Sequence, residues 1–93
     1  MAKKSSKYRN LVANRLTRVR GVLMRNAPKN TVRAFAKRIG VPEKTYEKWE
    51  SGDNLIPQEI AAGLEDSDGV SLSYLYSRDP KRLEPEFLFV RRA

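Results

Sequence analysis

Apolar residues recur at steps of three and four positions through the first quarter of the chain. The series consists of Tyr8, Leu11, Val12, Leu16, Val19, Val22 and Leu23. This spacing forms one apolar stripe along a helix, and the stripe is flanked by Arg9, Arg15, Arg18, Arg20 and Arg25. We therefore predict a first helix from Tyr8 that Gly21 can bend or fray, followed by a loop at "RNAPKN".

A second and a third helix are predicted on either side of a sharp turn. The second follows Thr31, a suitable N-cap, and ends at Gly40, which can adopt the left-handed conformation of a helix C-terminus. Pro42 opens the third helix at its first turn, where a missing N–H costs little, and Gly52 closes it. The inward positions of the pair are Val32, Phe35, Ala36, Ile39, Tyr46 and Trp49.

The remaining elements are less uniform in pattern. Pro57 starts a fourth helix with Ile60, Ala61 and Leu64 facing inward, and it ends in "EDSDG". The segment "VSLSYLYS" carries apolar residues at helical spacing after Ser71, so we favour a short fifth helix, although its alternating residues also suit a strand. The run from Phe87 to Val90 has the aromatic and β-branched residues of a strand, and the domain offers it no partner strand of its own.

Charge is distributed unevenly along the chain. The net charge is +8. Residues 1–48 hold 14 lysines and arginines against two acids, which gives +12, and residues 49–93 hold five against nine, which gives −4. Such segregation indicates that the first half meets a polyanion, most readily nucleic acid, with an anionic membrane surface or an acidic protein as alternatives.

Composition narrows the classes of function. A chain of 93 residues with 40% hydrophobic residues makes one small domain. It has no cysteine and no histidine, so the usual ligands of zinc and the usual general acid–base group are missing. No residue set supports a catalytic triad, a metal cage or a phosphate-binding glycine loop. We expect no enzymatic activity, no metal and no cofactor. No apolar run is long enough for a membrane span or a signal peptide, so we expect a cytoplasmic protein.

The window from Val32 to Trp49 meets the demands of a helix-turn-helix, in which two helices cross steeply. A small residue, Ala36, stands at the close approach, Gly40 supplies the turn, and apolar residues occupy the surrounding positions. The stretch "TVRAFAKRIGVPEKTYEKWESG" resembles the lambda-repressor-like (Cro/cI-type) helix-turn-helix domains of phage and bacterial regulators. Further likeness lies in Ile56-Pro57 and in "GVSLSYLY". The resemblance covers roughly residues 11–76.

The resemblance implies an all-α fold: a compact five-helix helix-turn-helix domain, with a short C-terminal β-strand as an optional addition. We expect a flexible basic arm at residues 1–7, the DNA-binding domain at 8–77 and a C-terminal tail at 78–93. The tail either folds back on the domain or pairs with its symmetry mate, as the C-terminal strand of Cro does. The basic arm is either unengaged or grips a groove of DNA.

The resemblance also implies the residues that meet DNA. Glu43, Lys44 and Glu47 match positions that usually reach base edges, and Thr45 and Lys48 match positions nearer the backbone. Thr31 would offer a hydroxyl and backbone amides to a phosphate, and the arm would add Lys3, Lys4 and Lys7. Val32 departs from the family, which commonly has a glutamine there that touches phosphate and braces the third helix. Glu50 is expected to pair with a helix-one arginine, Arg20 first and Arg25 second.

These features predict a sequence-specific regulator of transcription, a repressor, that binds palindromic double-stranded DNA as a homodimer. Two alternatives remain open. The chain can be an antitoxin-type autoregulator whose tail binds a protein partner. It can also be a helix-turn-helix-derived protein-interaction module without DNA binding, since Val32, Glu43 and Glu47 do not favour contact with phosphates.

Overall fold

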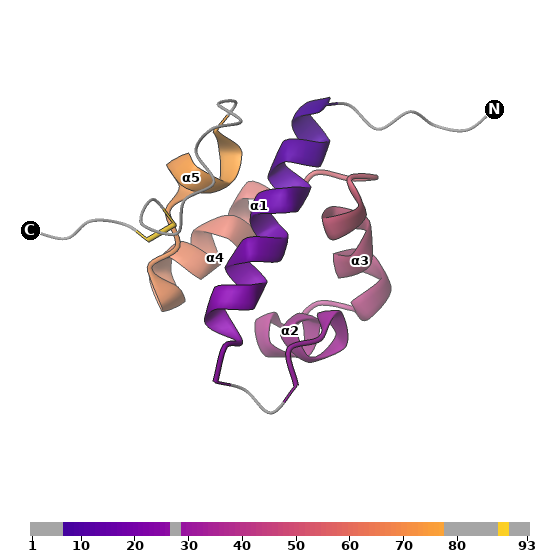
Figure 1. Cartoon of the computed structure of the whole chain (residues 1–93), viewed down its shortest axis with the longest axis vertical. Helices are drawn as coiled ribbons and strands as arrows, with labels where there is room; N and C mark the ends of the chain where they lie inside the picture. The colour runs from indigo at the N-terminus through magenta and orange to yellow at the C-terminus, as the bar shows by residue number, and fades with distance from the viewer. Residues whose placement is uncertain (1–6, 27–28, 78–87, 90–93) are drawn as a thin grey trace, which may run out of the picture.

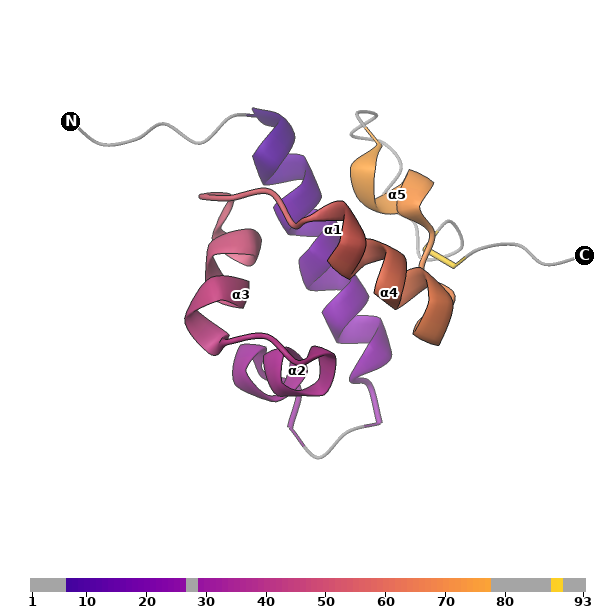
Figure 2. The same cartoon turned by 180° about the vertical axis from the view of Figure 1, so that it is seen from behind.

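The computed structural model describes residues 7–26, 29–77 and 88–89 and confirms the all-α fold. The helices are α1 (Lys7–Leu23), α2 (Val32–Ile39), α3 (Glu43–Ser51), α4 (Gln58–Asp68) and α5 (Leu72–Tyr76). In Figure 1, α1 crosses the molecule diagonally, with α3 and α2 to one side and α4 and α5 to the other. Figure 2 shows from behind that α4 lies across α1. No helix in the described ranges is long and apolar enough to cross a membrane.

The helix boundaries follow local sequence signals. The Thr31 hydroxyl accepts a hydrogen bond from the amide of Ala34 (3.1 Å), and the Ser71 hydroxyl accepts one from the amide of Tyr74 (3.2 Å). Both residues are therefore the N-caps that the sequence predicts. Segment 70–77 forms the helix we favoured. Gly21 does not end α1, which continues to Leu23, so the long separation of Arg20 from Thr31 lies mainly in the loop that precedes α2.

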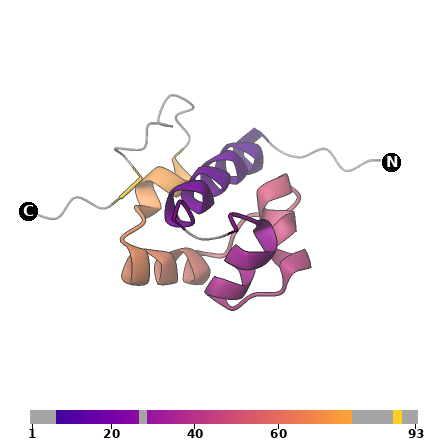
Figure 3. The same ribbon diagram turned by 60° about the horizontal axis from the view of Figure 1, so that its bottom comes forward.

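One apolar core joins all five helices. The largest fully buried apolar side chains are Tyr46, Tyr74, Phe35, Leu16, Ile56, Leu75, Leu88, Val12, Val19 and Val70. The α2–α3 pair packs on one half of α1 and the α4–α5 pair on the other, and Figure 3 separates the two pairs most clearly. Burial of apolar area of this extent is the main force that holds α3 on the domain.

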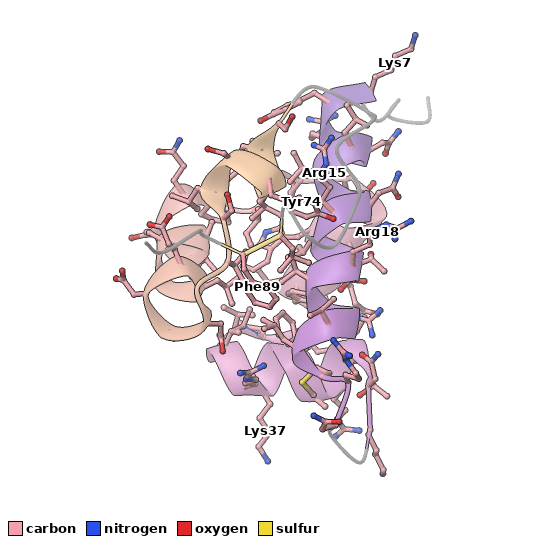
Figure 4. The ribbon with its side chains drawn as sticks, turned by 60° about the vertical axis from the view of Figure 1, so that its left-hand side comes forward. Lys7, Arg15, Arg18, Lys37, Tyr74 and Phe89 are labelled. Carbon is pink, nitrogen blue, oxygen red and sulfur yellow. The ribbon has the colours of Figure 1, made fainter. Side chains whose placement is uncertain are left out.

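Arg15 was expected on the flank of α1, and that expectation is wrong. Its side chain is fully buried, its Nη1 donates to the carbonyl oxygen of Ser77, and its guanidinium lies 5.9 Å from the ring centroid of Tyr74. Figure 4 shows Arg15 directed from α1 toward Tyr74 on α5. The cation–π contact and the carbonyl hydrogen bond offset part of the cost of burying the charge.

The tail does find a partner within the domain, contrary to expectation. Phe89 forms an isolated antiparallel bridge with Val70, and the amide of Ser71 donates to the carbonyl oxygen of Leu88 (2.6 Å). Leu88 is fully buried, whereas Phe89 is 41% exposed. The described tail residues therefore fold back on the α4–α5 corner. Phe87 and Val90, the ends of the predicted strand, lie outside the described residues.

Gly52 is expected to be the most demanding glycine for the placement of α3. Its φ is +85°, and a Cβ built there would lie 2.3 Å from the Asn10 Oδ1 of α1. Gly40 has φ +77° with nothing within 4 Å of such a Cβ. We predict that Gly40→Ala lowers the free energy of unfolding by about 1–2 kcal/mol through backbone strain. Gly52→Ala should cost roughly 1 kcal/mol more, because Asn10 must also move.

Urea unfolding of both variants measures the difference. Gly63→Ala within α4 is the control, since nothing lies within 4 Å of its added methyl group and alanine favours a helix by about 0.5–1 kcal/mol. Equal losses for Gly40→Ala and Gly52→Ala would contradict a close approach of α1 and α3.

Candidate nucleic-acid interface

The crossing of α2 and α3 has the geometry that a helix-turn-helix requires. Ala36 is 1% exposed at the approach of the two helices. Gly40 adopts the left-handed conformation and its amide donates to the carbonyl of Lys37 (3.2 Å), while the amide of Val41 donates to that of Ala36 (3.0 Å). These bonds satisfy the last carbonyls of α2 and turn the chain directly into α3, so the turn is short and fully hydrogen-bonded.

Aromatic side chains hold the inner face of α3. Phe35 and Tyr46 make an edge-to-face contact with ring centroids 5.4 Å apart, and Tyr46 and Trp49 make another at 5.8 Å. Tyr46 is fully buried and Trp49 is 6% exposed. Such pairs stabilise by about 0.5–1.5 kcal/mol beyond the burial of area. The predicted inward face of α3 is thus confirmed, and it fixes the rotation of α3 about its axis.

The carboxylate of Glu50 joins α3 to α1. Arg20 donates from Nε to Oε2 (2.7 Å) and from Nη2 to Oε1 (3.2 Å), so the ion pair is bidentate. Thr17 Oγ1 also donates to Oε1 (3.0 Å) and the Tyr46 hydroxyl donates to Oε2 (2.5 Å). The expected partner of Glu50 is therefore Arg20 and not Arg25. We call Thr17, Arg20, Tyr46 and Glu50 the Glu50 network.

The network also fixes the protonation states of its members. Burial raises the pKa of Tyr46 well above its usual value, and the hydrogen bond to Glu50 raises it further. The hydrogen bond to Glu50 raises the pKa of Arg20. Tyr46 thus remains a neutral donor and Arg20 a cation. Arg20 Nη1 in addition donates to the backbone oxygen (3.2 Å) and the Oδ1 (2.9 Å) of Asn30, which ties the loop before α2 to the same point.

With its inner face fixed, α3 exposes every residue that was predicted to meet a ligand. Glu43, Lys44, Thr45, Glu47 and Lys48 are all exposed. Positions 44, 47 and 48 lie opposite the buried Tyr46 and Trp49 on the helix, because each residue advances the side chains by about 100°. These three residues therefore form the outermost strip of α3.

The other predicted residues lie at two helix starts. Thr31 is exposed at the start of α2, where it caps the helix through its hydroxyl oxygen. Its O–H remains a donor for a further partner. Lys7 is exposed as the first residue of α1. Lys3 and Lys4 lie outside the described residues.

Charges in the described ranges separate by face. The basic residues of α2 and α3 lie on the two helices that carry the exposed strip, whereas α4 carries Glu59, Glu65, Asp66 and Asp68. A single ion pair, Arg38 Nη2 to Asp68 Oδ1 at 2.6 Å, connects α2 to α4. An open cavity of about 500 Å³ lies between these helices beside that ion pair, away from the exposed strip. The described chain thus offers a cationic surface only on the side of α1, α2 and α3.

A family model described as helix-turn-helix matches residues 23–75, more than half of the 93-residue chain. The chain belongs to the lambda-repressor and Cro type of helix-turn-helix family. No curated protein and no solved structure gives a significant match. Proteins of this family are DNA-binding regulators of transcription, so α3 is the recognition helix of this domain. The matched region contains α2 to α5 and leaves most of α1 outside.

Some residues of this helix-turn-helix were not anticipated from the sequence. Thr17 and Asn30 join the Glu50 network and its loop, and Arg33 forms an ion pair with Glu43, Nε to Oε1 at 4.0 Å. Thr17 could have been found, since it lies one helical turn before Arg20 on the same face of α1. No periodic signal connects Arg33 with Glu43, because the pair spans the turn between two helices.

Loss of the Glu50 carboxylate should loosen the recognition helix. Glu50 is 10% exposed, so Glu50→Ala would leave Arg20 and Tyr46 nearly buried without their partner. We predict a loss of about 2–4 kcal/mol in the free energy of unfolding, measured in urea. Asp68→Ala is the matched control. It breaks the Arg38–Asp68 pair, in which Arg38 is 40% exposed, and should cost no more than about 1 kcal/mol. Equal costs would show that the Glu50 network is no more than a surface ion pair.

Proposed function

We propose that this protein is a sequence-specific repressor that binds palindromic double-stranded DNA as a homodimer in the cytoplasm. The observation that supports it is the fixed and exposed strip of α3, which the Glu50 network and the aromatic contacts hold outward. A helix of this diameter enters the major groove of B-DNA, where each base pair presents a distinct pattern of donors and acceptors.

Each exposed residue has a role in this proposal. Lys44 donates to guanine O6 or N7, while Glu43 and Glu47 accept from cytosine N4. Thr45 and Lys48 lie nearer the rim of the groove. Thr31 offers its hydroxyl and the first amides of α2 to a phosphate. The arm, with Lys3, Lys4 and Lys7, contacts the backbone or a groove beside the site.

Dimerisation is supported by the one exposed aromatic side chain of the tail. Phe89 and Leu55 are the only large hydrophobic residues classed as exposed among those described. The bridge to Val70 fixes the backbone of Phe89 on the domain, so its ring is presented on a rigid surface. We place Phe89 in the contact between protomers. Two recognition helices would then reach half-sites about 34 Å apart.

The direct test is a binding titration with a fluorescent duplex over a series of salt concentrations. We expect binding that weakens linearly in log–log form as salt rises, because Lys and Arg release counterions from phosphates. Absence of binding to any duplex of a random pool, even at low salt, would contradict the proposal and favour a protein-interaction module. Sequences selected from that pool would define the operator.

Two lysines of α3 should then differ in their effects. Lys44→Ala should change the preferred base pair at one position, by about 1–3 kcal/mol of discrimination, because it removes a contact with a base edge. Lys48→Ala should weaken all sequences alike and reduce the salt slope by about one. A uniform loss for both variants would place Lys44 on a phosphate instead.

The dimer is tested by mass in solution. We expect Phe89→Ser to give a monomer by sedimentation while Leu88, the buried tail residue, stays in place. Leu55→Ser is the matched control, because Leu55 is 39% exposed and Phe89 is 41% exposed, and it should leave the dimer intact. Dimers of unchanged affinity with Phe89→Ser would refute this contact.

A further inference from the structure

An ion pair joins the first turns of the two helices of the helix-turn-helix. Arg33 is the second residue of α2 and Glu43 is the first residue of α3, and Arg33 Nε lies 4.0 Å from Glu43 Oε1. The two side chains are 86% and 47% exposed. Neither residue contributes to the core, so the pair lies on the surface beside the N-cap Thr31 and the exposed strip of α3.

The pair has little value for stability. Exposed ion pairs typically change affinity or stability by no more than a few fold, and a separation of 4.0 Å is at the outer limit of such contacts. Its consequence is instead electrostatic and geometric. Glu43 already lies at the positive end of α3, where a carboxylate is favoured, and Arg33 neutralises the charge that Glu43 would otherwise present to a polyanion.

The guanidinium retains donors that the pair does not use. Arginine has five N–H groups in a planar fork. The contact with Glu43 involves Nε, which leaves the two terminal nitrogens directed to solvent. A fork held at one edge and free at the other matches the oxygens of a phosphate bidentately. Val32, the residue before Arg33, packs against the core and cannot donate from its side chain.

We infer that Arg33 is an additional DNA-backbone contact of this domain and that Glu43 is its positioning residue. The inference rests on the proposed function, because it places Arg33 on a phosphate at the rim of the groove that α3 enters. The first helix of a helix-turn-helix crosses the backbone while the second lies in the groove, so a residue at the start of α2 faces a phosphate and not a base. An acidic residue at position 43 is thereby compatible with DNA: it acts through Arg33.

A double-mutant cycle on the full chain tests this inference. The wild type, Arg33→Ala, Glu43→Ala and the double variant are titrated against one fixed duplex over a salt series. Arg33→Ala should weaken binding about 3- to 10-fold and reduce the salt slope by about one. Glu43→Ala should weaken the wild type about 2- to 5-fold and leave the Arg33→Ala variant unchanged, since its effect passes through Arg33. Melting temperatures should stay within roughly 3 °C of wild type.

Lys37→Ala is the control for charge alone. Lys37 lies one turn after Arg33 on α2, it points away from the body of the domain in Figure 4, and no ion pair to it is present among the described residues. Its effect should add to that of Glu43→Ala without coupling. Three results would overturn the inference: equal effects of Glu43→Ala with and without Arg33, tighter binding of Glu43→Ala, or a change in base preference by Glu43→Ala. Failure of the wild type to bind any duplex would instead contradict the proposed function itself.

Discussion

The orientation of the recognition helix depends on one nearly buried carboxylate. Glu50 accepts hydrogen bonds from Thr17, from two nitrogens of Arg20 and from Tyr46. A carboxylate buried without such partners would be strongly unfavourable, so α3 is stable on the domain only in the rotation and translation that satisfy them. Because Arg20 also binds Asn30, the same contact sets the entry of α2. The geometry of both helices is thus coupled to α1.

The exposed chemistry follows from that constraint. Once Tyr46, Trp49 and Glu50 face inward, helix geometry leaves positions 44, 47 and 48 outward. The pairing of Arg33 with Glu43 then adjusts the charge of the rim, while the acids of α4 lie on a different helix and leave the strip of α3 clear. The buried network and the exposed strip therefore do separate jobs: the first gives position and the second gives recognition.

Much of this arrangement could be predicted from the sequence, because its signals are local. Ala36, Gly40 and the inward aromatic residues meet steric demands within a window of fewer than twenty residues, and the Arg20–Glu50 pair was anticipated from family resemblance. Arg15 was missed because periodicity treats arginine as polar, whereas its long stem reaches Tyr74 and Ser77 across the core. The bridge of Phe89 to Val70 was missed because it joins residues far apart in sequence with no paired strand pattern. The residues of α3 were predicted to face outward, and they do, but their partners on DNA depend on a ligand that a sequence does not specify.

The central claim is that the face formed by the start of α2 and the outward side of α3 binds duplex DNA. An NMR titration of the ¹⁵N-labelled full chain with a duplex at low salt tests it most directly, because every amide reports its own environment. The account predicts that the largest shift changes occur at residues 31–33 and 43–48, while the amides of α4 from Gln58 to Asp68 change little. Shift changes centred on α4 and α5, with residues 43–48 unaffected, would contradict it.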